Sequence, residues 1–127
     1  MNLKINYYMF ICPYTQGDLA TVHSAEHNEW LSALTDGSRT WLGGMRTGAG
    51  RFDNSQWIWV DETEFDYTNW QKRQPNNYRR NQYCLEMNFG PPGKWNDDNC
   101  NAQVGHNSYI CEDNSISKWQ LYCTLQK

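Results

Sequence analysis

Two histidines lie four positions apart in the chain, a spacing that can direct two imidazole rings toward one metal ion. They are His23 and His27, in the run His-Ser-Ala-Glu-His. Zinc proteases place a glutamate directly after the first histidine of such a pair, whereas this chain has Ser24 there. An enzyme would also need a nucleophile with its base, or a paired acid and base. We therefore expect no catalytic metal and predict that the protein is not an enzyme.

A second group of side chains that could bind a ligand is a run of cations between residues 71 and 80, where the sequence has no acid. The four cations are Lys72, Arg73, Arg79 and Arg80. Beside Tyr78 and Trp95, they suit sulfated or sialylated glycans, or an acidic protein patch, through bidentate and stacking contacts. Such binding would not require calcium and would weaken with salt. A solvated loop without a ligand is the other interpretation.

The five cysteines favour an oxidising, extracellular setting, so we expect a secreted protein. Cys84 and Cys100 can close a sixteen-residue loop, and Cys12 with Cys111 would tie the start of the chain to its end. In the chain-entropy account these closures contribute about 3 and about 4.7 kcal/mol. Cys123 is then left free, buried or paired between chains. No pair of cysteines has the close spacing of a zinc site.

Length and charge narrow the class of protein. The chain has 127 residues and a formal net charge of -3, which favours one domain and argues against general nucleic-acid binding. The longest apolar stretch, residues 5–12, is far shorter than the roughly 18 to 20 residues of a membrane span, and short for a secretory signal. Aromatic residues make up 15% of the chain, so we expect a core of flat side chains in a turn-rich fold.

One helix is predicted from its end signals. Ser24 is a suitable N-cap for residues 25–34, and residues 36–37, Asp-Gly, supply the end. Trp30, Leu31 and Leu34 fall on one stripe, which we expect to face the core.

Short strands and a long irregular segment are expected around this helix. Residues 40–43 and 57–60 have the bulky pattern of strands, and residues 44–55 have the composition of a loop. Residues 61–101 contain three of the four prolines and little periodicity. A segment of this length in a small domain is normally functional, or is held by a crosslink.

These landmarks, taken in order, resemble the C-type lectin domain over residues 12–112. The run from Phe65 to Asn101 is most similar to the soluble single-domain lectins of fish and venoms. The landmarks are Gly17 to Val22, Ser24-Ala25-Glu26, Trp41 to Gly44, Trp57-Ile58-Trp59, Phe65 to Trp70, Gln74-Pro75-Asn76, Cys84, Trp95-Asn96-Asp97, Cys100 and Tyr109-Ile110-Cys111. The resemblance implies an α+β fold with two short helices, two small antiparallel sheets and a long irregular loop region, stabilised by disulfides. We divide the chain into a domain, residues 1–112, and a C-terminal extension, residues 113–127.

The resemblance also implies pairings and a core. The disulfides would join Cys12 with Cys111 and Cys84 with Cys100. The expected core aromatics are Trp41, Trp57, Trp59, Trp70 and Tyr109. Because few residues precede the first cysteine, a sheet edge could lack its partner strand. The extension could cover that edge, or two copies could dimerise through it or through Cys123.

The family resemblance implies one calcium site, at which the ion contacts two sugar hydroxyls. The residues that match as calcium and carbohydrate ligands are Gln74, Asn76, Gln82, Asn96 and Asp97. Only Asp97 is anionic, so the site should bind Ca²⁺ weakly unless Glu86 or Asp98 turns inward. The resemblance also implies a cis peptide bond before Pro75.

The predicted function is therefore that of a carbohydrate-binding lectin domain whose partner is a glycan or glycoprotein. Gln-Pro resembles the family's galactose-type motif and Pro-Asn its mannose-type motif, so both specificities stay open. The alternative is calcium-independent recognition of an anionic glycan, a protein or ice by the same fold.

Overall fold

The computed structural model describes residues 17–48, 57–102, 108–113 and 122–126. Within these ranges the chain forms one α-helix, one 3-10 turn and seven strands. In chain order the elements are β1 (Gly17–Leu19), α2 (Ala25–Leu34), β2 (Thr40–Arg46), β3 (Trp57–Trp59), η2 (Tyr78–Arg80), β4 (Cys84–Met87), β5 (Trp95–Asp98), β6 (Ser108–Asp113) and β7 (Tyr122–Gln126).

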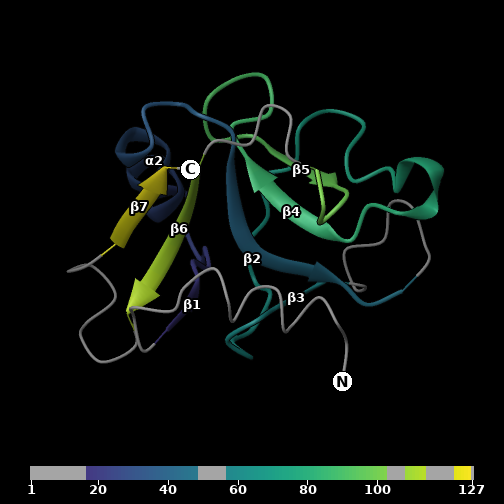
Figure 1. The fold of residues 1–127 in the computed structure, drawn as a ribbon, viewed down its shortest axis with the longest axis horizontal. Coiled ribbons are helices and arrows are strands. Elements are labelled where there is room, and N and C mark those ends of the chain that lie inside the picture. Colours follow the sequence, from purple (N-terminus) through teal and green to yellow (C-terminus); the bar gives the residue numbers. More distant parts are fainter. Residues whose placement is uncertain (1–16, 49–56, 103–107, 114–121, 127) are drawn as a thin grey trace.

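The strands form one mixed sheet, so the prediction of two small antiparallel sheets is wrong in this respect. The order is β1-β6-β2-β4-β5, with β3 on β2 and β7 on β6. The parallel pairing of Thr40 with Ser108 and Trp41 with Tyr109 connects β2 to β6 and makes the sheet continuous. Figure 1 shows α2 at one side of this sheet and the loop that carries η2 at the other.

The helix confirms its predicted bounds but not its predicted buried stripe. The Ser24 side chain accepts a hydrogen bond from the His27 backbone N–H, and Thr35 is the C-cap. Leu31 is fully buried, whereas Trp30 and Leu34 are 37% and 40% exposed. The buried face instead includes Asn28, because this side chain is hydrogen-bonded to partners beneath the helix.

The core is centred on Trp95, which is fully buried. The rings of Trp59, Phe65, Tyr67 and Trp70 surround it, with centroid distances of 5.7, 6.3, 5.6 and 5.7 Å. The aromatic core predicted from composition is therefore present. Trp57 and Trp59 are buried in this cluster, and half-buried Trp70 packs against it. Trp41 is buried in a second cluster, against which half-buried Tyr109 packs.

Strand β7 lies within the segment predicted as an extension, and it pairs antiparallel with β6. The described part of the extension therefore covers one edge of β6. Its register places the Cα of Cys123 opposite that of Cys111. Cys111 is disulfide-bonded, but Cys12 lies outside the described residues, so its predicted pairing stays a prediction, as does dimerisation through Cys123.

Candidate functional site

The predicted ligands come from two places in the fold. Gln74, Asn76 and Gln82 lie on the irregular segment between β3 and β4, and Asn96 and Asp97 lie on β5. The Cys84–Cys100 disulfide is present, as predicted, and joins the start of β4 to the turn after β5. The Gln74-Pro75 peptide bond is cis, which confirms the prediction for the loop.

Backbone contacts with β5 hold the irregular segment in place. The Gln71 N–H donates to the Trp95 carbonyl at 2.8 Å, and the Trp95 N–H donates to the Asn69 carbonyl at 2.9 Å. Trp70 and Trp95 form an isolated parallel bridge. A segment with little secondary structure of its own is therefore attached to the core just before the predicted ligands begin.

Asp97, the one anion among the predicted ligands, is already paired with a cation of the chain. Its Oδ2 atom lies 2.5 Å from Arg46 Nη2, and both side chains are completely buried. The backbone N–H groups of Asn76 and Asn77 donate to the same carboxylate at 3.1 and 2.7 Å. Both carboxylate oxygens are therefore occupied by donors.

The Arg46 guanidinium makes further contacts around this carboxylate. Its Nε–H donates to the Gln82 carbonyl at 2.9 Å, and the guanidinium carbon lies 4.9 Å from the centre of the Trp57 ring. The side chain therefore connects the end of β2 to both β5 and the end of the irregular segment. This role of Arg46 has no local sequence signal, because residues 44–55 have the composition of a loop, whereas Arg46 is the last residue of β2.

The side chains of three of the four remaining predicted ligands are hydrogen-bonded to other groups of the chain. Asn96 donates its amide N–H to Glu86 at 2.9 Å, so this side chain is directed toward β4. The Tyr78 N–H is shared by the side-chain oxygens of Asn76 and Gln82, at 3.2 and 2.9 Å. Gln74 Oε1 is buried and has no hydrogen-bond partner among the described residues.

A calcium ion does not fit these residues as they are arranged. Ca²⁺ takes six to eight oxygen ligands, several of them normally anionic. Here the only anionic ligand is neutralised by Arg46, and the side-chain oxygens of Asn76 and Gln82 accept from the backbone. Among the described residues no group of three or more His, Cys, Asp or Glu side chains is placed to hold a metal.

The two acids that could have added charge are committed to another arginine. Glu86 Oε1 and Asp98 Oδ2 lie 2.7 and 3.3 Å from Arg39 Nη2. Glu86 is fully buried, and burial raises the pKa of its carboxyl above the usual value, although hydrogen bonds from Arg39 and Asn96 lower it. This network connects β4 and β5 to Arg39.

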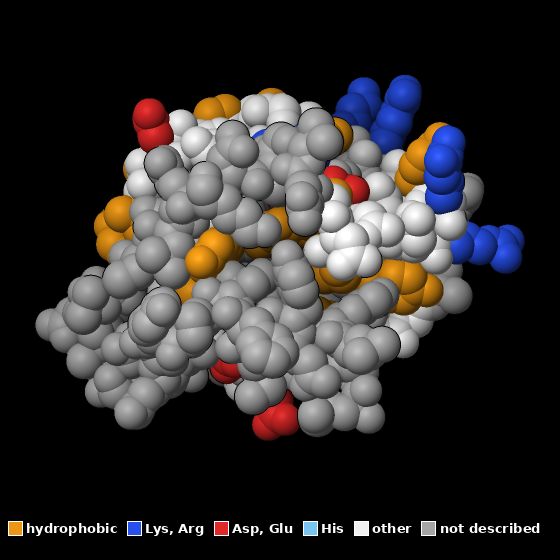
Figure 2. Space-filling view, viewed as in Figure 1, with side chains coloured by type: hydrophobic (Ala, Val, Ile, Leu, Met, Phe, Trp, Pro, Cys, Tyr) orange, Lys and Arg blue, Asp and Glu red, His pale blue; other side chains and the backbone are white. Residues whose placement is uncertain are grey.

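The four cations of the irregular segment lie on the surface of the protein. Lys72, Arg73, Arg79 and Arg80 are exposed, and within the described ranges none of them is paired with a carboxylate. Tyr78 is 57% exposed, with the Arg79 guanidinium 5.3 Å from its ring centre. Lys and Arg side chains accordingly gather at one end of the molecule in Figure 2. We call these five residues the basic loop.

The backbone in and next to the basic loop has several residues with positive φ. Arg73, Asn77, Arg79 and Arg80 have φ values of 69°, 46°, 57° and 57°, in the left-handed region that residues other than glycine rarely adopt. Such conformations cost about 1–3 kcal/mol each and persist only where the surroundings enforce them, most often at functional sites. Asn77 is fully buried and hydrogen-bonded to Asp97 and Gln82, so it is one of the groups that enforce this shape.

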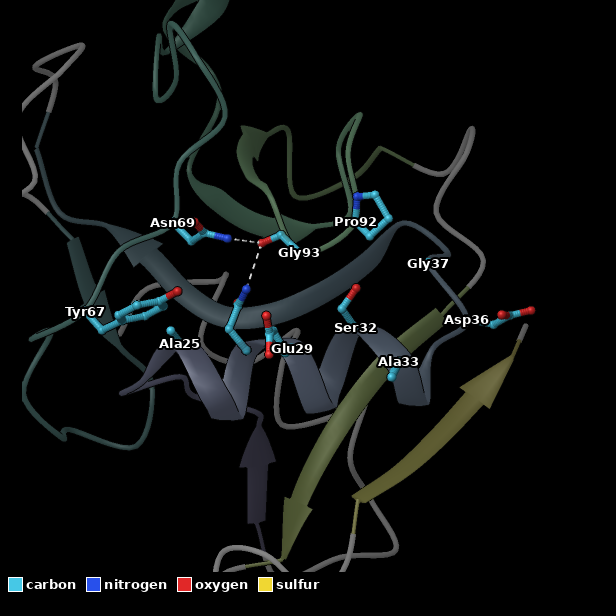
Figure 3. A pocket seen from close by; sticks show the side chains of 11 residues that line it. Ala25, Glu29, Ser32, Ala33, Asp36, Gly37, Tyr67, Asn69, Pro92 and Gly93 are labelled. Carbon is cyan, nitrogen blue, oxygen red and sulfur yellow. Dashed lines mark hydrogen bonds between the residues drawn. The ribbon is translucent and has the colours of Figure 1, made fainter.

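A separate pocket lies along α2, at the other side of the molecule from η2. Its volume is about 700 Å³, and its walls include Glu29, Asp36 and Tyr67. Figure 3 shows the Asn69 amide donating to the Gly93 carbonyl, which also accepts from Asn28. Burial and, to a smaller extent, the negative charge of Glu29 raise the pKa of Tyr67. The predicted ligands do not line this pocket.

The described residues form a small module, a mixed sheet with a helix on one side and a long irregular segment on the other. The family model described as "Lectin C-type domain" matches residues 4–113. The chain belongs to this family, whose members are binding proteins and not enzymes.

Comparison with individual proteins agrees with this assignment. The chain is 36% identical over 94 residues to ladderlectin of Oncorhynchus mykiss, covering 70% of this chain and 47% of ladderlectin. The carbohydrate-recognition domain of cow CD23, crystallised in the presence of an oligosaccharide, is 28% identical, with a TM-score of 0.67 over 82% of this chain and 74% of that one. A calcium-independent type II antifreeze protein is 27% identical, with a TM-score of 0.67 over 84% and 75%.

The chain thus spans about half the length of ladderlectin, one of the curated relatives that it matches. None of the helices in the described residues is both long and apolar enough to span a membrane.

Proposed function

We propose that this domain recognises anionic glycans, sulfated or sialylated, through the basic loop and without a calcium ion. The observation that carries the proposal is the set of four exposed cations beside an exposed tyrosine, none of them paired with a carboxylate in the described residues. Guanidinium groups match sulfate and carboxylate oxygens by paired hydrogen bonds, and a tyrosine ring offers a face to a sugar. The family's carbohydrate binding supports a glycan as the partner.

Under this proposal, three of the five predicted ligands have a supporting role. Asn76, Gln82 and Asp97 hold the base of the basic loop through the contacts described above, and Asp97 is too deeply buried to meet a sugar. Neutral galactose or mannose would then lack the bridging ion on which the predicted specificity depends. We therefore favour the calcium-independent alternative over the galactose-type and mannose-type interpretations.

The test is a binding titration with a sulfated oligosaccharide and its unsulfated counterpart. Replacing Arg79→Gln and Arg80→Gln together should weaken binding of the sulfated form about tenfold, since each exposed charge pair contributes up to about 1 kcal/mol. The variant Arg79→Lys with Arg80→Lys keeps the positive charge and should lose less affinity for the sulfated form than the glutamine variant does. A control with Ala33→Glu and Leu34→Glu makes the same change in net charge on exposed positions of α2 and should bind like the wild type.

Two results would refute the proposal. One is unchanged affinity of the Arg79→Gln, Arg80→Gln variant for the sulfated ligand. The other is equal binding of the sulfated and unsulfated forms by the wild type.

Ice binding is a second candidate, favoured by the structural similarity to the calcium-independent antifreeze protein. The exposed cations count against it, because strongly hydrated charges suit an ice surface poorly. Thermal hysteresis in a cooling assay, unaffected by Arg79→Gln and Arg80→Gln, would support this candidate over glycan binding.

We also propose that the protein is secreted. The Cys84–Cys100 disulfide and the disulfide-bonded Cys111 fit an oxidising compartment. The soluble lectins among its relatives are consistent with this location.

A further inference from the structure

We infer that the Arg46 guanidinium is a built-in substitute for a divalent cation, and that it is the residue that makes the binding loop independent of calcium. The inference deepens the proposed function, and it rests on that function only for its glycan readout. Its metal and stability readouts need no glycan.

The position of Arg46 supports this inference first. A cation at the base of such a loop must neutralise the buried carboxylate and hold together segments that are far apart in sequence. Arg46 does both, since it pairs with Asp97 on β5 and donates to the Gln82 carbonyl at the end of the irregular segment. Its backbone N–H also donates to the Tyr83 carbonyl at 2.9 Å, which fixes the point from which the side chain extends.

Asp97 transmits this organisation to the basic loop. Its carboxylate accepts from the Asn76 and Asn77 backbone N–H groups, directly before η2. Asn77 in turn accepts from the N–H of Gln82, two residues after the end of η2, at 3.1 Å. Both ends of the turn that carries Tyr78, Arg79 and Arg80 are therefore connected to one carboxylate, and Arg46 is the charged partner that allows this carboxylate to be buried.

The chemistry of the two cations differs in a way that can be measured. A bound Ca²⁺ ion dissociates and can be removed by a chelator, whereas the Arg46 guanidinium is covalently attached to the chain. Both Arg46 and Asp97 are fully buried, so the pair is shielded from solvent and salt. A divalent ion would have to displace Arg46 or share one carboxylate with it, and both alternatives are opposed by repulsion between the cations.

We therefore expect the stability of a protein without Arg46 to depend on a bound metal ion. In Arg46→Ala, Asp97 is left as a buried anion without its arginine partner, and the Gln82 carbonyl loses the donor that joins it to this carboxylate. Removing one partner of a buried pair is strongly destabilising, so its Tm in chelator should fall by about 10 °C or more. Millimolar Ca²⁺ should recover part of that loss, and Tb³⁺ should gain luminescence sensitised by Trp57.

The experiment compares four proteins by thermal unfolding, in calcium and in chelator, and by Tb³⁺ luminescence. They are the wild type, Arg46→Ala, Arg46→Lys and the double variant Arg46→Ala with Asp97→Asn. We expect equal Tm values in both buffers for the wild type and for Arg46→Lys. The double variant should be insensitive to calcium, because it lacks both the cation and the anion. Only Arg46→Ala should respond to Ca²⁺ and Tb³⁺.

Three results would overturn the inference: a wild-type Tm that rises with Ca²⁺, an Arg46→Ala variant as stable as the wild type in chelator, or one that gains no response to either ion. If Arg46→Ala does not fold in chelator, its refolding in Ca²⁺ decides the question, and the wild-type measurement does so independently. A wild type that ignores calcium but binds no sulfated glycan would refute the proposed function and leave this inference intact.

Discussion

The indole N–H of Trp95 donates a 2.8 Å hydrogen bond to the side-chain oxygen of Asn28, and this contact joins the start of β5 to α2. The same Asn28 side chain donates to the Gly93 carbonyl at 3.0 Å. Both bonds are buried, so α2 and the turn before β5 are held in one arrangement. The helix thus supports the start of β5, to which the irregular segment is hydrogen-bonded.

Replacing Asn28→Ala should lower the free energy of unfolding by about 1–3 kcal/mol, because it leaves the buried Trp95 indole N–H and the Gly93 carbonyl with fewer partners. Urea denaturation monitored by tryptophan fluorescence measures this loss. Glu29→Ala, at the next and exposed helix position, is the matched control and should change stability by less than about 0.5 kcal/mol. Equal effects of the two substitutions would show that the Asn28 contacts contribute nothing specific.

Glu86 should make stability fall as the pH rises through the weakly acidic range. Its pKa in the folded protein is raised above the usual value, so the folded state holds the proton more tightly than the unfolded state does. Its contribution is therefore complete below the ordinary pKa of 4.5 and is lost as the pH rises through the folded pKa. In Glu86→Gln, this decrease in the free energy of unfolding with rising pH should be absent.

Urea midpoints at a series of pH values from about 4 to about 7 measure that slope. The exposed Glu64→Gln is the matched control and should keep the wild-type profile. A profile of Glu86→Gln that parallels the wild type would contradict the assignment to Glu86, whatever its absolute stability. The groups that face Glu86 are Arg39, Asn96 and Asp98, and all three are retained in these variants.

In the pocket along α2, the effect of the Glu29 charge on the pKa of Tyr67 can be tested. Burial raises the pKa of Tyr67 most, and the carboxylate of Glu29 raises it further. Glu29→Gln should therefore lower the Tyr67 pKa without returning it fully to 10.0, whereas Asp36→Asn in the same pocket should leave it unchanged. Ultraviolet titration, with Tyr67→Phe used to identify the signal, measures the shift. An equal shift in both variants would point to a general field and not to Glu29.

The sequence predicted the helix and the aromatic core because their signals are local. Ser24 caps the helix whatever lies beyond it, and a chain rich in tryptophan has few other side chains with which to fill a core. The prediction that Trp30 and Leu34 lie on the buried stripe of the helix was wrong, because it rested on hydrophobicity alone. Hydrogen bonds to Trp95 and Gly93, which are distant in sequence, instead turn Asn28 inward.

The site was predicted less completely for the same reason. The residues that match the family pattern were identified, but what they contact depends on a residue outside that pattern. Arg46 follows two glycines and a methionine and carries no periodic signal, so the residues around it were interpreted as a loop. The extension of β2 to Arg46 and its burial against Asp97 arise from strand pairing with β3 and β4, which only the folded structure reveals.

The most direct test of the account is binding of the wild-type protein to an immobilised glycan panel in millimolar calcium and again in chelator. We predict equal binding to sulfated or sialylated glycans in both buffers, weakening as salt is raised, and no binding to neutral galactose or mannose. Binding to neutral galactose or mannose that disappears in chelator would contradict the account, because it would mean that a calcium ion bridges the sugar despite Arg46.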